Sequence, residues 1–496
     1  MTKRIFYPII FLFQIYAANA QHIDSTEAVK LTLDDVVNMA IEQSPSIKYR
    51  QNLNVNSYWR WKNFQANFRP QLGLSGDLPN YQQTNQAITQ PDGSIEFRQI
   101  AQLRTTADMS LSQIVPQTGT TIYGASSLYR VQDYNKNTIN WSGSPFYIGF
   151  VQPLFAYNWY KWSRMTEPLL YEEAQRDYIE SVEEVSLSAA NRFFNYLRIQ
   201  TNYNLAANNL KNSEDNLRIA EVKRKLGQIS ENDFSRIQLS VLNAKKALNT
   251  SSMDLKNADF ELKSYIGMDQ HRNIALEIPT EMSLFYIDPD KALAETLANR
   301  KEAPEFERRL IEADRELVKA KRNTGLSTTL RGSYGTSKNS PELAGVYEDT
   351  EKQQMLKLTM NIPILDWGKS ASAVKLAESR RDLVLYDVER EKLNFEREVV
   401  VEVEQFNLLK DQLETAKEAD KVSENGYMIS LKKFQNGEIS ITDLNISLSE
   451  REKGKRDYIS SLEDYWESYY YLRILTLYDF VLNQKITYIN PSLSVR

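Results

Sequence analysis

Two short stretches of the chain carry an aspartate at the same place in a shared pattern, Gly-x-Ile-Ser-x-x-Asp-apolar. The first copy begins at Gly227 and the second at Gly437. A glycine can adopt the positive φ that ends a helix, and a serine hydroxyl can cap the helix that follows. Asp233 and Asp443 then lie in a first turn, where a carboxylate can stabilise the helix or attract a cation. Each stretch is therefore predicted to be the tip of a helical hairpin.

Other site chemistry is largely excluded by the composition. The chain of 496 residues has no cysteine and only two histidines, His22 and His271. A thiolate metal site, a disulfide framework and a cysteine nucleophile are therefore excluded, and a histidine-based metal centre or catalytic triad is not expected. Aspartate and glutamate lie mostly beside lysine and arginine on predicted helix faces, which is typical of a solvated surface. We expect no enzyme activity, no metal, no cofactor and no nucleic-acid partner.

Long segments of helical periodicity flank both tips. Apolar residues recur at spacings of three, four and seven after Trp159 and again after Val374, which predicts coiled-coil-like packing. The returning helices are expected over 230–267 and 440–484. Shorter helices over 33–68 and 292–323 are expected to complete them end to end.

Alternation of period two precedes the long helices and predicts strands of about ten residues. The expected strands lie at about 71–80 and 146–155 in the first half, and at about 328–336 and 354–365 in the second half. The first half also contains a predicted inserted hairpin over about 100–131. The pattern leaves open whether this hairpin joins the sheet or projects beyond it.

The strand near 360 has the clearest difference in polarity between its two faces. One face carries Leu356, Leu358 and Met360. The other face carries Lys357, Thr359 and Asn361. We expect the first face to contact lipid and the second to face a water-filled lumen.

The start of the chain has the features of an export signal. Lys3 and Arg4 precede an apolar run, and Ala18-Asn19-Ala20 has the form of a cleavage site. The run is shorter than the roughly 20 residues of a membrane-spanning helix. The expected organisation is a signal peptide over 1–20, a first structural repeat over 21–280, a second over 281–485, and a C-terminal tail over 486–496.

An exported chain with amphipathic strands and no predicted spanning helix suggests an outer-membrane β-barrel. The strands of one chain are too few to close a barrel, so we expect a homo-oligomer with one shared barrel. Aromatic residues between Tyr123 and Trp162 gather at the strand ends and at the junction with the helix. Such a cluster is typical of the girdle at a membrane interface.

Several motifs in a fixed order then carry a resemblance to a known family. They are the opening Leu31-Thr32-Leu33-Asp34-Asp35 with Ser44-Pro45-Ser46, its echo over 299–305, Gln152-Pro153-Leu154-Phe155, Pro363-Ile364-Leu365-Asp366-Trp367-Gly368, and both tips. Over nearly all of its mature length the chain resembles TolC-family outer-membrane efflux proteins. The resemblance implies a mainly α-helical fold with β-strands. It also implies a homotrimer with a 12-stranded barrel and a helical tunnel through the periplasm.

The resemblance further implies a channel-tunnel of a tripartite efflux or type I secretion system in a Gram-negative outer membrane. Its partners would be a periplasmic adaptor, an inner-membrane pump and outer-membrane lipid, and its gate would lie at the helical tips. In a trimer, Asp233 and Asp443 would place six carboxylates around one axis and favour cations. Alternatively, each aspartate serves only the first turn of its own helix. Ile229, Ile439 and Ile441 are expected to contribute apolar contacts to closure.

One feature of the sequence departs from this family pattern, and its long helical hairpins are also found in other classes of protein. The inserted hairpin exceeds the two strands expected of the first half, which leaves the strand count of the barrel open. A periplasmic adaptor or a coiled-coil scaffold would also contain long helical hairpins. Such a protein would lack amphipathic strands divided between two repeats.

Overall fold

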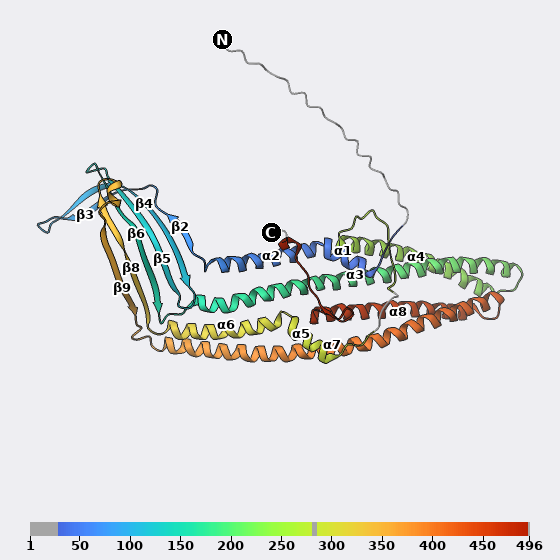
Figure 1. Ribbon diagram of the computed structural model, residues 1–496. Helices are drawn as coiled ribbons and strands as arrows, with labels where there is room; N and C mark the ends of the chain where they lie inside the picture. The colour runs from blue at the N-terminus through green and yellow to red at the C-terminus, as the bar shows by residue number, and fades with distance from the viewer. Residues whose placement is uncertain (1–27, 280–284, 495–496) are drawn as a thin grey trace, which may run out of the picture.

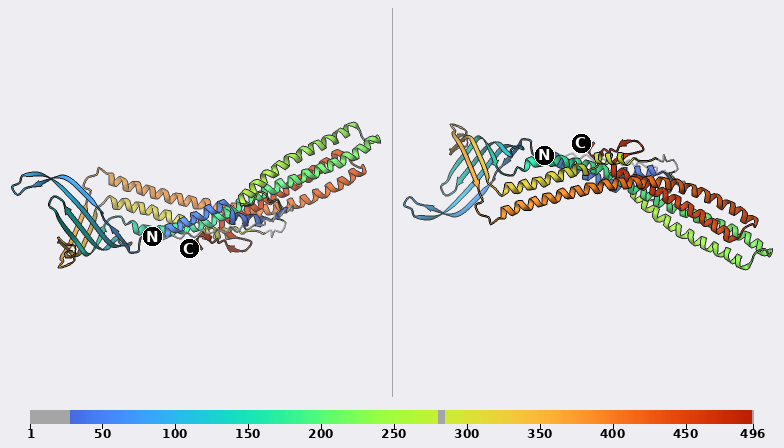
Figure 2. Two further views of the ribbon diagram at one scale, coloured as in Figure 1. Left: turned by 90° about the horizontal axis from the view of Figure 1, so that it is seen from above. Right: turned by 90° about the horizontal axis from the view of Figure 1, so that it is seen from below.

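The computed structural model describes residues 28–279 and 285–494, and the predicted signal peptide over 1–20 lies outside them. A large sheet lies at one end of the molecule, and long helices run from it to two helical tips at the other end (Figure 1). The helical part bends near its middle, as both views in Figure 2 show. The chain is thus mainly α-helical with a sheet, in agreement with the predicted fold class.

Two helices of similar length, α3 (Trp159–Lys225) and α7 (Lys369–Asn436), extend from the sheet to the tips. At a rise of 1.5 Å per residue, each spans roughly 100 Å. Shorter helices pack alongside them in the expected end-to-end arrangement. Beside α3 these are α1 (Leu33–Gln43), α2 (Pro45–Ala66) and α4 (Glu231–Ile266). Beside α7 these are α5 (Pro289–Asn299), α6 (Glu302–Asn323) and α8 (Ile441–Thr476).

Short polar residues and glycine fix the ends of these helices. The Thr32 hydroxyl accepts a hydrogen bond from the Asp35 amide at 3.2 Å, and the Asp35 carboxylate accepts one from the Thr32 amide at 3.0 Å. Ser44 caps α2, and Pro45 follows it directly. Proline lacks a backbone N–H, but at this first position of a helix an N–H would have no partner within the helix. Gly267 ends α4 with a φ of +73°.

The main hydrophobic core lies where α1, α3, α7 and α8 meet. Its largest fully buried side chains include Phe193 and Phe194 from α3, Phe406 from α7, and Leu462 and Leu472 from α8. Two short parallel strands, β1 (Val29–Leu31) and β7 (Ile274–Leu276), pack against this core. Because α3 belongs to the first half of the chain and α7 and α8 to the second, this core joins the two halves.

The large sheet has the strand order β2-β4-β5-β6-β8-β9, and all neighbouring strands are antiparallel. A further strand, β3, pairs with the half of β4 that lies beyond β2. The strands are β2 (Gln71–Ser75), β3 (Asn80–Thr89), β4 (Ile95–Val115), β5 (Thr120–Asp133), β6 (Thr138–Leu154), β8 (Ser327–Ser340) and β9 (Glu351–Asn361). A 3-10 turn, η1 (Ala344–Tyr347), lies between β8 and β9.

Some strand boundaries differ from those that the alternation placed. The strand expected to continue to 365 ends at Asn361, because Pro363 has no backbone N–H to donate to a neighbouring strand. The strand expected over 71–80 ends at Ser75, before Gly76 and Pro79. The inserted hairpin expected over 100–131 lies within the sheet as β4 and β5.

The remaining elements follow α8. They are a two-stranded hairpin, β10 (Tyr478–Asp479) with β11 (Gln484–Lys485), and a short helix, α9 (Pro491–Ser494), which packs on α2. No helix in the described part of the chain combines the length and the hydropathy that crossing a membrane would require.

Candidate functional site

The first tip joins α3 to α4 through a glycine in the left-handed conformation. Gly227 has a φ of +69°, and its amide donates to the Arg224 carbonyl at 3.0 Å. Ser230 caps α4, where its hydroxyl accepts from the Asp233 amide at 3.1 Å and donates to the Asp233 carboxylate at 2.6 Å. The hydrogen bonds of Asp233 therefore lie within the first turn of its own helix.

The second tip repeats this geometry between α7 and α8. Gly437 has a φ of +80°, and Ser440 caps α8. The Asp443 amide donates to the Ser440 hydroxyl at 3.2 Å, while the Asp443 carboxylate accepts from the Ser440 hydroxyl at 2.7 Å and from its amide at 3.1 Å. These hydrogen bonds from Ser440 lower the pKa of Asp443, so its carboxylate is charged at neutral pH.

An apolar cluster, which we call the tip cluster, joins the two tips. Its buried members Ala220, Phe234 and Ile237 come from the first hairpin, and Leu217, Ile229 and Ile441 pack against them. Ile441 is the first residue of α8, so the second hairpin inserts a side chain into the first. Ile439 is half-buried and is not among the members of the tip cluster.

Cationic groups share the first tip with Asp233. The last turn of α3 carries Lys223, Arg224 and Lys225. Arg224 forms an ion pair with Glu231 at 2.8 Å, and its guanidinium lies 4.5 Å from the centre of the Phe234 ring. The positive charges of these residues would oppose the attraction of a cation to Asp233. The motif alone did not predict this.

The glycines at the tips give the first testable prediction. Gly437→Ala should destabilise the protein by about 1 kcal/mol, because an alanine disfavours positive φ although nothing lies within 4 Å of the new methyl group. Gly426→Ala is the matched control, since Gly426 is exposed in the interior of α7 with equally open space around it. There an alanine should stabilise by about 0.5–1 kcal/mol. Urea unfolding of both variants measures the two changes, and equal signs would contradict the assigned conformation.

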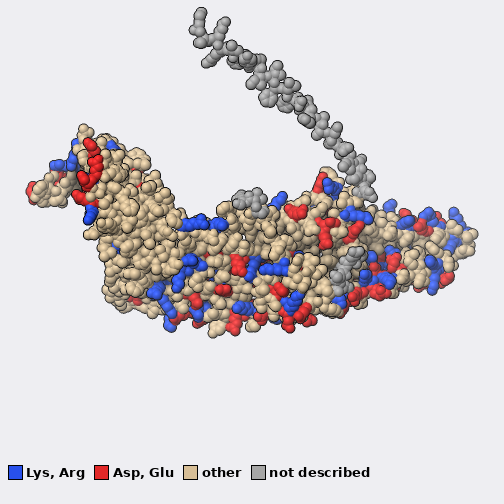
Figure 3. Space-filling model, viewed as in Figure 1, with Lys and Arg blue, Asp and Glu red and all other residues tan. Residues whose placement is uncertain are grey.

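The sheet carries one apolar face that crosses β2, β4, β5, β6, β8 and β9. Leu356 lies opposite Gly332, Leu358 opposite Leu330, and Met360 opposite Thr328, with exposed fractions of 76%, 56% and 55% for the three β9 side chains. The registers place further apolar residues on this face, namely Leu72, Leu74, Met109, Leu111, Ile122, Phe146, Ile148, Phe150 and Tyr334. Figure 3 shows few charged groups over the middle of the sheet and many over the helices.

The opposite face of the sheet contains charged and small polar side chains. Lys357 lies opposite Arg331, and Thr359 lies opposite Thr329. Asn361 lies opposite Ser327 at the end of the same ladder. The two faces therefore differ in polarity, as the alternation in the sequence predicted. Contact of one face with lipid and of the other with a lumen stays a prediction.

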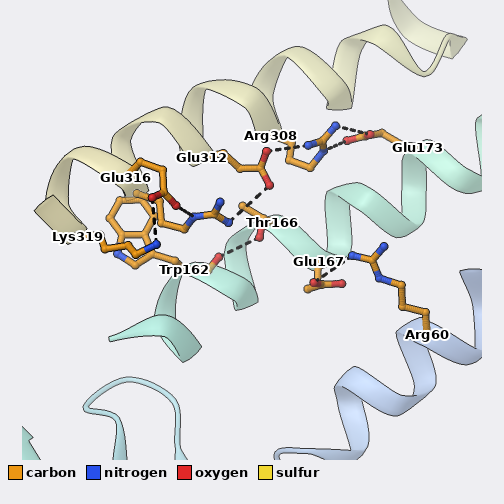
Figure 4. Close-up of polar contacts among 10 residues, drawn as sticks. Arg60, Trp162, Thr166, Glu167, Glu173, Arg308, Glu312, Glu316 and Lys319 are labelled. Carbon is orange, nitrogen blue, oxygen red and sulfur yellow. Dashed lines mark hydrogen bonds and ion pairs between the residues drawn. The ribbon is translucent and has the colours of Figure 1, made fainter. Parts of the chain in front are cut away.

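Ion pairs hold the helices together near the sheet, as Figure 4 shows. Arg308 of α6 binds Glu173 of α3 through two hydrogen bonds, at 2.6 and 3.0 Å. Arg60 of α2 lies 3.4 Å from Glu167 of α3. Burial raises the pKa of Glu173, although the hydrogen bond and the charge of Arg308 oppose this shift. These acidic residues link helices, and α3 and α6 come from different halves of the chain.

A buried charge network, which sequence reasoning missed, lies at the end of α8. Arg473 donates to both carboxylate oxygens of Glu183, at 2.8 and 2.9 Å, and to Asp479 at 2.8 Å. The Tyr488 hydroxyl donates to Glu183 at 2.6 Å, and the Glu183 side chain is fully buried. Burial opposes the charge on Arg473, but Glu183 outweighs it and raises the pKa of the guanidinium. No local motif connects Glu183 to Arg473, since they lie far apart in the sequence.

Comparisons with known proteins identify the fold. Residues 293–446 match the family model described as outer membrane efflux protein. The outer membrane protein VceC from Vibrio cholerae has a TM-score of 0.62 at 12% identity, covering 92% of this chain and 96% of that chain. The CmeC outer membrane channel of Campylobacter jejuni has a TM-score of 0.61 at 14% identity, and the match covers 93% of this chain and 88% of that chain. No curated protein sequence matches the chain significantly.

These matches confirm the resemblance to TolC-family efflux proteins that the order of the sequence motifs indicated. The matched family is described as outer membrane efflux proteins, and the CmeC structure is described as an outer membrane channel. At these identities the solved structures establish the fold alone.

Proposed function

We propose that the chain is an outer-membrane channel-tunnel of a tripartite efflux or type I secretion system in a Gram-negative bacterium. Three copies would share one β-barrel in the outer membrane, and their helices would form a tunnel in the periplasm. The two structural repeats, 21–280 and 281–485, would each supply strands to the barrel and one hairpin tip to the periplasmic gate. A periplasmic adaptor and an inner-membrane pump would dock to the helical part.

The observation that carries this proposal is the amphipathic sheet with two open edges. Among the described residues, β2 and β9 lie at the two ends of the strand order, and each has one edge without a ladder. In hydrocarbon, each unpaired backbone group would cost several kcal/mol. Antiparallel pairing of β9 with β2 of the next copy would satisfy the open edge of β2 and part of the open edge of β9, which is the longer strand. A periplasmic adaptor or scaffold, the alternative function, would need helical hairpins but no sheet of this kind.

The gate can be tested through the two aspartates of the tips. If Asp233 and Asp443 form a ring of carboxylates, a trivalent cation on the periplasmic side should block single channels, because charges in a narrow passage are poorly screened. The double variant Asp233→Ala/Asp443→Ala should then lose most of this block in planar bilayers, with hexaamminecobalt(III) as the probe.

Asp254→Ala is the matched control, since Asp254 is exposed in the body of α4. This variant should be blocked as strongly as the unchanged protein. Block that survives in the double variant would remove the carboxylate ring and leave the two aspartates with their role in the first helical turns. Absence of any channel from the reconstituted protein would count against the proposed function itself.

A further inference from the structure

We propose that the inserted hairpin, β4 with β5, is part of the membrane wall, so that three copies close an 18-stranded barrel. This inference rests on the proposed function, in which three copies share one barrel. The sheet of one chain has six strand positions, β2, β4, β5, β6, β8 and β9. The arrangement implied by the resemblance would use four positions from each chain.

The hydrogen-bonded ladders place the hairpin inside the sheet. β4 pairs with β2 from Ser112 opposite Gln71 to Asp108 opposite Ser75. On its other side β5 pairs with β6 along nearly its whole length, from Thr121 opposite Val151 onward. β2 and β6 therefore do not pair with one another in this sheet. A hairpin that projected from the wall would have to give up one of these two ladders.

The side chains of the hairpin continue both faces of the neighbouring strands. Met109, Leu111 and Ile122 lie on the face of Leu358, and about half of each side chain is exposed. Ser110 lies on the opposite face, the one that carries Lys357. The exposed apolar face of β9 thus continues onto the hairpin, and such a face has a physical reason in lipid and none in water.

Contacts on the polar face show that β5 and β6 fit one another. A methyl group added at Gly149 of β6 would lie 2.6 Å from the ring of Tyr123 of β5. The Tyr123 ring also meets the Tyr147 ring edge-on, with 6.1 Å between their centres. An aromatic ring that covers a glycine on the neighbouring strand stabilises the pairing of the two strands.

The turn of the hairpin is held at the level where the strands pass into the helices. The Asn158 side chain, which caps α3, donates to the Pro116 carbonyl at 2.9 Å and to the Gln117 carbonyl at 3.2 Å. The Gln152 side chain donates to the Thr118 carbonyl at 3.2 Å. The hairpin thus begins at the same level as β6 ends, and it spans the same height of the wall.

The consequence is a passage that is wide at its membrane end. Barrel diameter grows roughly linearly with strand number, so a barrel of 18 strands is about 1.5 times as wide as one of 12 strands. Four helices of each chain, α2, α3, α6 and α7, adjoin the strands. The β4–β5 hairpin therefore widens the barrel without adding a helix to the tunnel below it.

Spin labels can test this placement, because the chain contains no native cysteine. Met109→Cys and Ser110→Cys place a label on either face of β4, and Leu358→Cys and Thr359→Cys do so on β9. The full-length protein is reconstituted in phosphatidylcholine–phosphatidylglycerol liposomes. Power saturation then measures how accessible each label is to oxygen, which is enriched in lipid, and to a water-soluble nickel chelate. The ratio of oxygen to nickel accessibility should be several-fold higher at 109 than at 110, and likewise at 358 than at 359.

If the accessibility ratio alternates between 358 and 359 in β9 but nickel accessibility is high at both 109 and 110, the inference is overturned and the proposed function stays intact. Absence of alternation in both strands would overturn the membrane barrel itself. Leu111→Cys and Ser112→Cys serve as a second pair if a label at 109 prevents assembly. Native mass spectrometry of the same samples should give three chains, and any other number would overturn the count of 18.

Discussion

Leu358→Arg should prevent stable assembly in the outer membrane. Leu358 lies within β9 on the apolar face, opposite Leu330. An arginine that faces lipid near the midplane costs about 2–4 kcal/mol, and a shared barrel would incur that cost once in every copy. Heat-sensitive oligomers in detergent extracts of outer-membrane fractions provide the measurement, and their yield should fall strongly.

Thr359→Arg is the matched control for this substitution. It introduces the same side chain at the next residue of the same strand, on the face that carries Lys357. In a water-filled lumen the guanidinium keeps its hydration, so oligomers should form in nearly normal yield. Equal yields of the two variants would mean that the apolar face does not contact lipid.

Arg473→Met should produce the largest loss of stability in the helical part. The substitution leaves the Glu183 carboxylate fully buried, with the Tyr488 hydroxyl as its remaining partner in this network. Removal of one member of a buried ion pair costs about 3–5 kcal/mol, because the other charge loses its compensation. Thermal unfolding followed by the helical circular dichroism signal should therefore show a lower midpoint.

An exposed ion pair supplies the control for Arg473. Arg218 pairs with Asp215 on the surface of α3, where both side chains are well exposed to solvent. Surface pairs of this kind contribute less than about 1 kcal/mol, so Arg218→Met should leave the midpoint nearly unchanged. Similar midpoints for Arg473→Met and Arg218→Met would argue against a stabilising role for the buried network.

The parts of the fold that the sequence predicted well are those fixed by local chemistry. Gly227 and Gly437 end their helices through positive φ, and Ser230 and Ser440 cap the next ones, so both tips were predictable from a short motif. The alternation around Leu358 likewise indicated the two faces of β9.

Other parts depend on contacts that a local pattern does not contain. β3 was not predicted, because its sequence from Asn80 to Thr89 is rich in amides and lacks an apolar face. The beginning of β6 was missed because a bulge between Gly143 and Phe146 interrupts the alternation. The pairing of Glu183 with Arg473 and the cation–π contact of Arg224 with Phe234 arise only when distant or adjoining segments fold together.

The tip cluster has a mechanical consequence. Because Ile441 of one hairpin packs among Phe234 and Ile237 of the other, a force applied to either tip is transmitted to both. In the proposed ring of three copies, we therefore expect the two tips of each chain to move together while this packing stays intact.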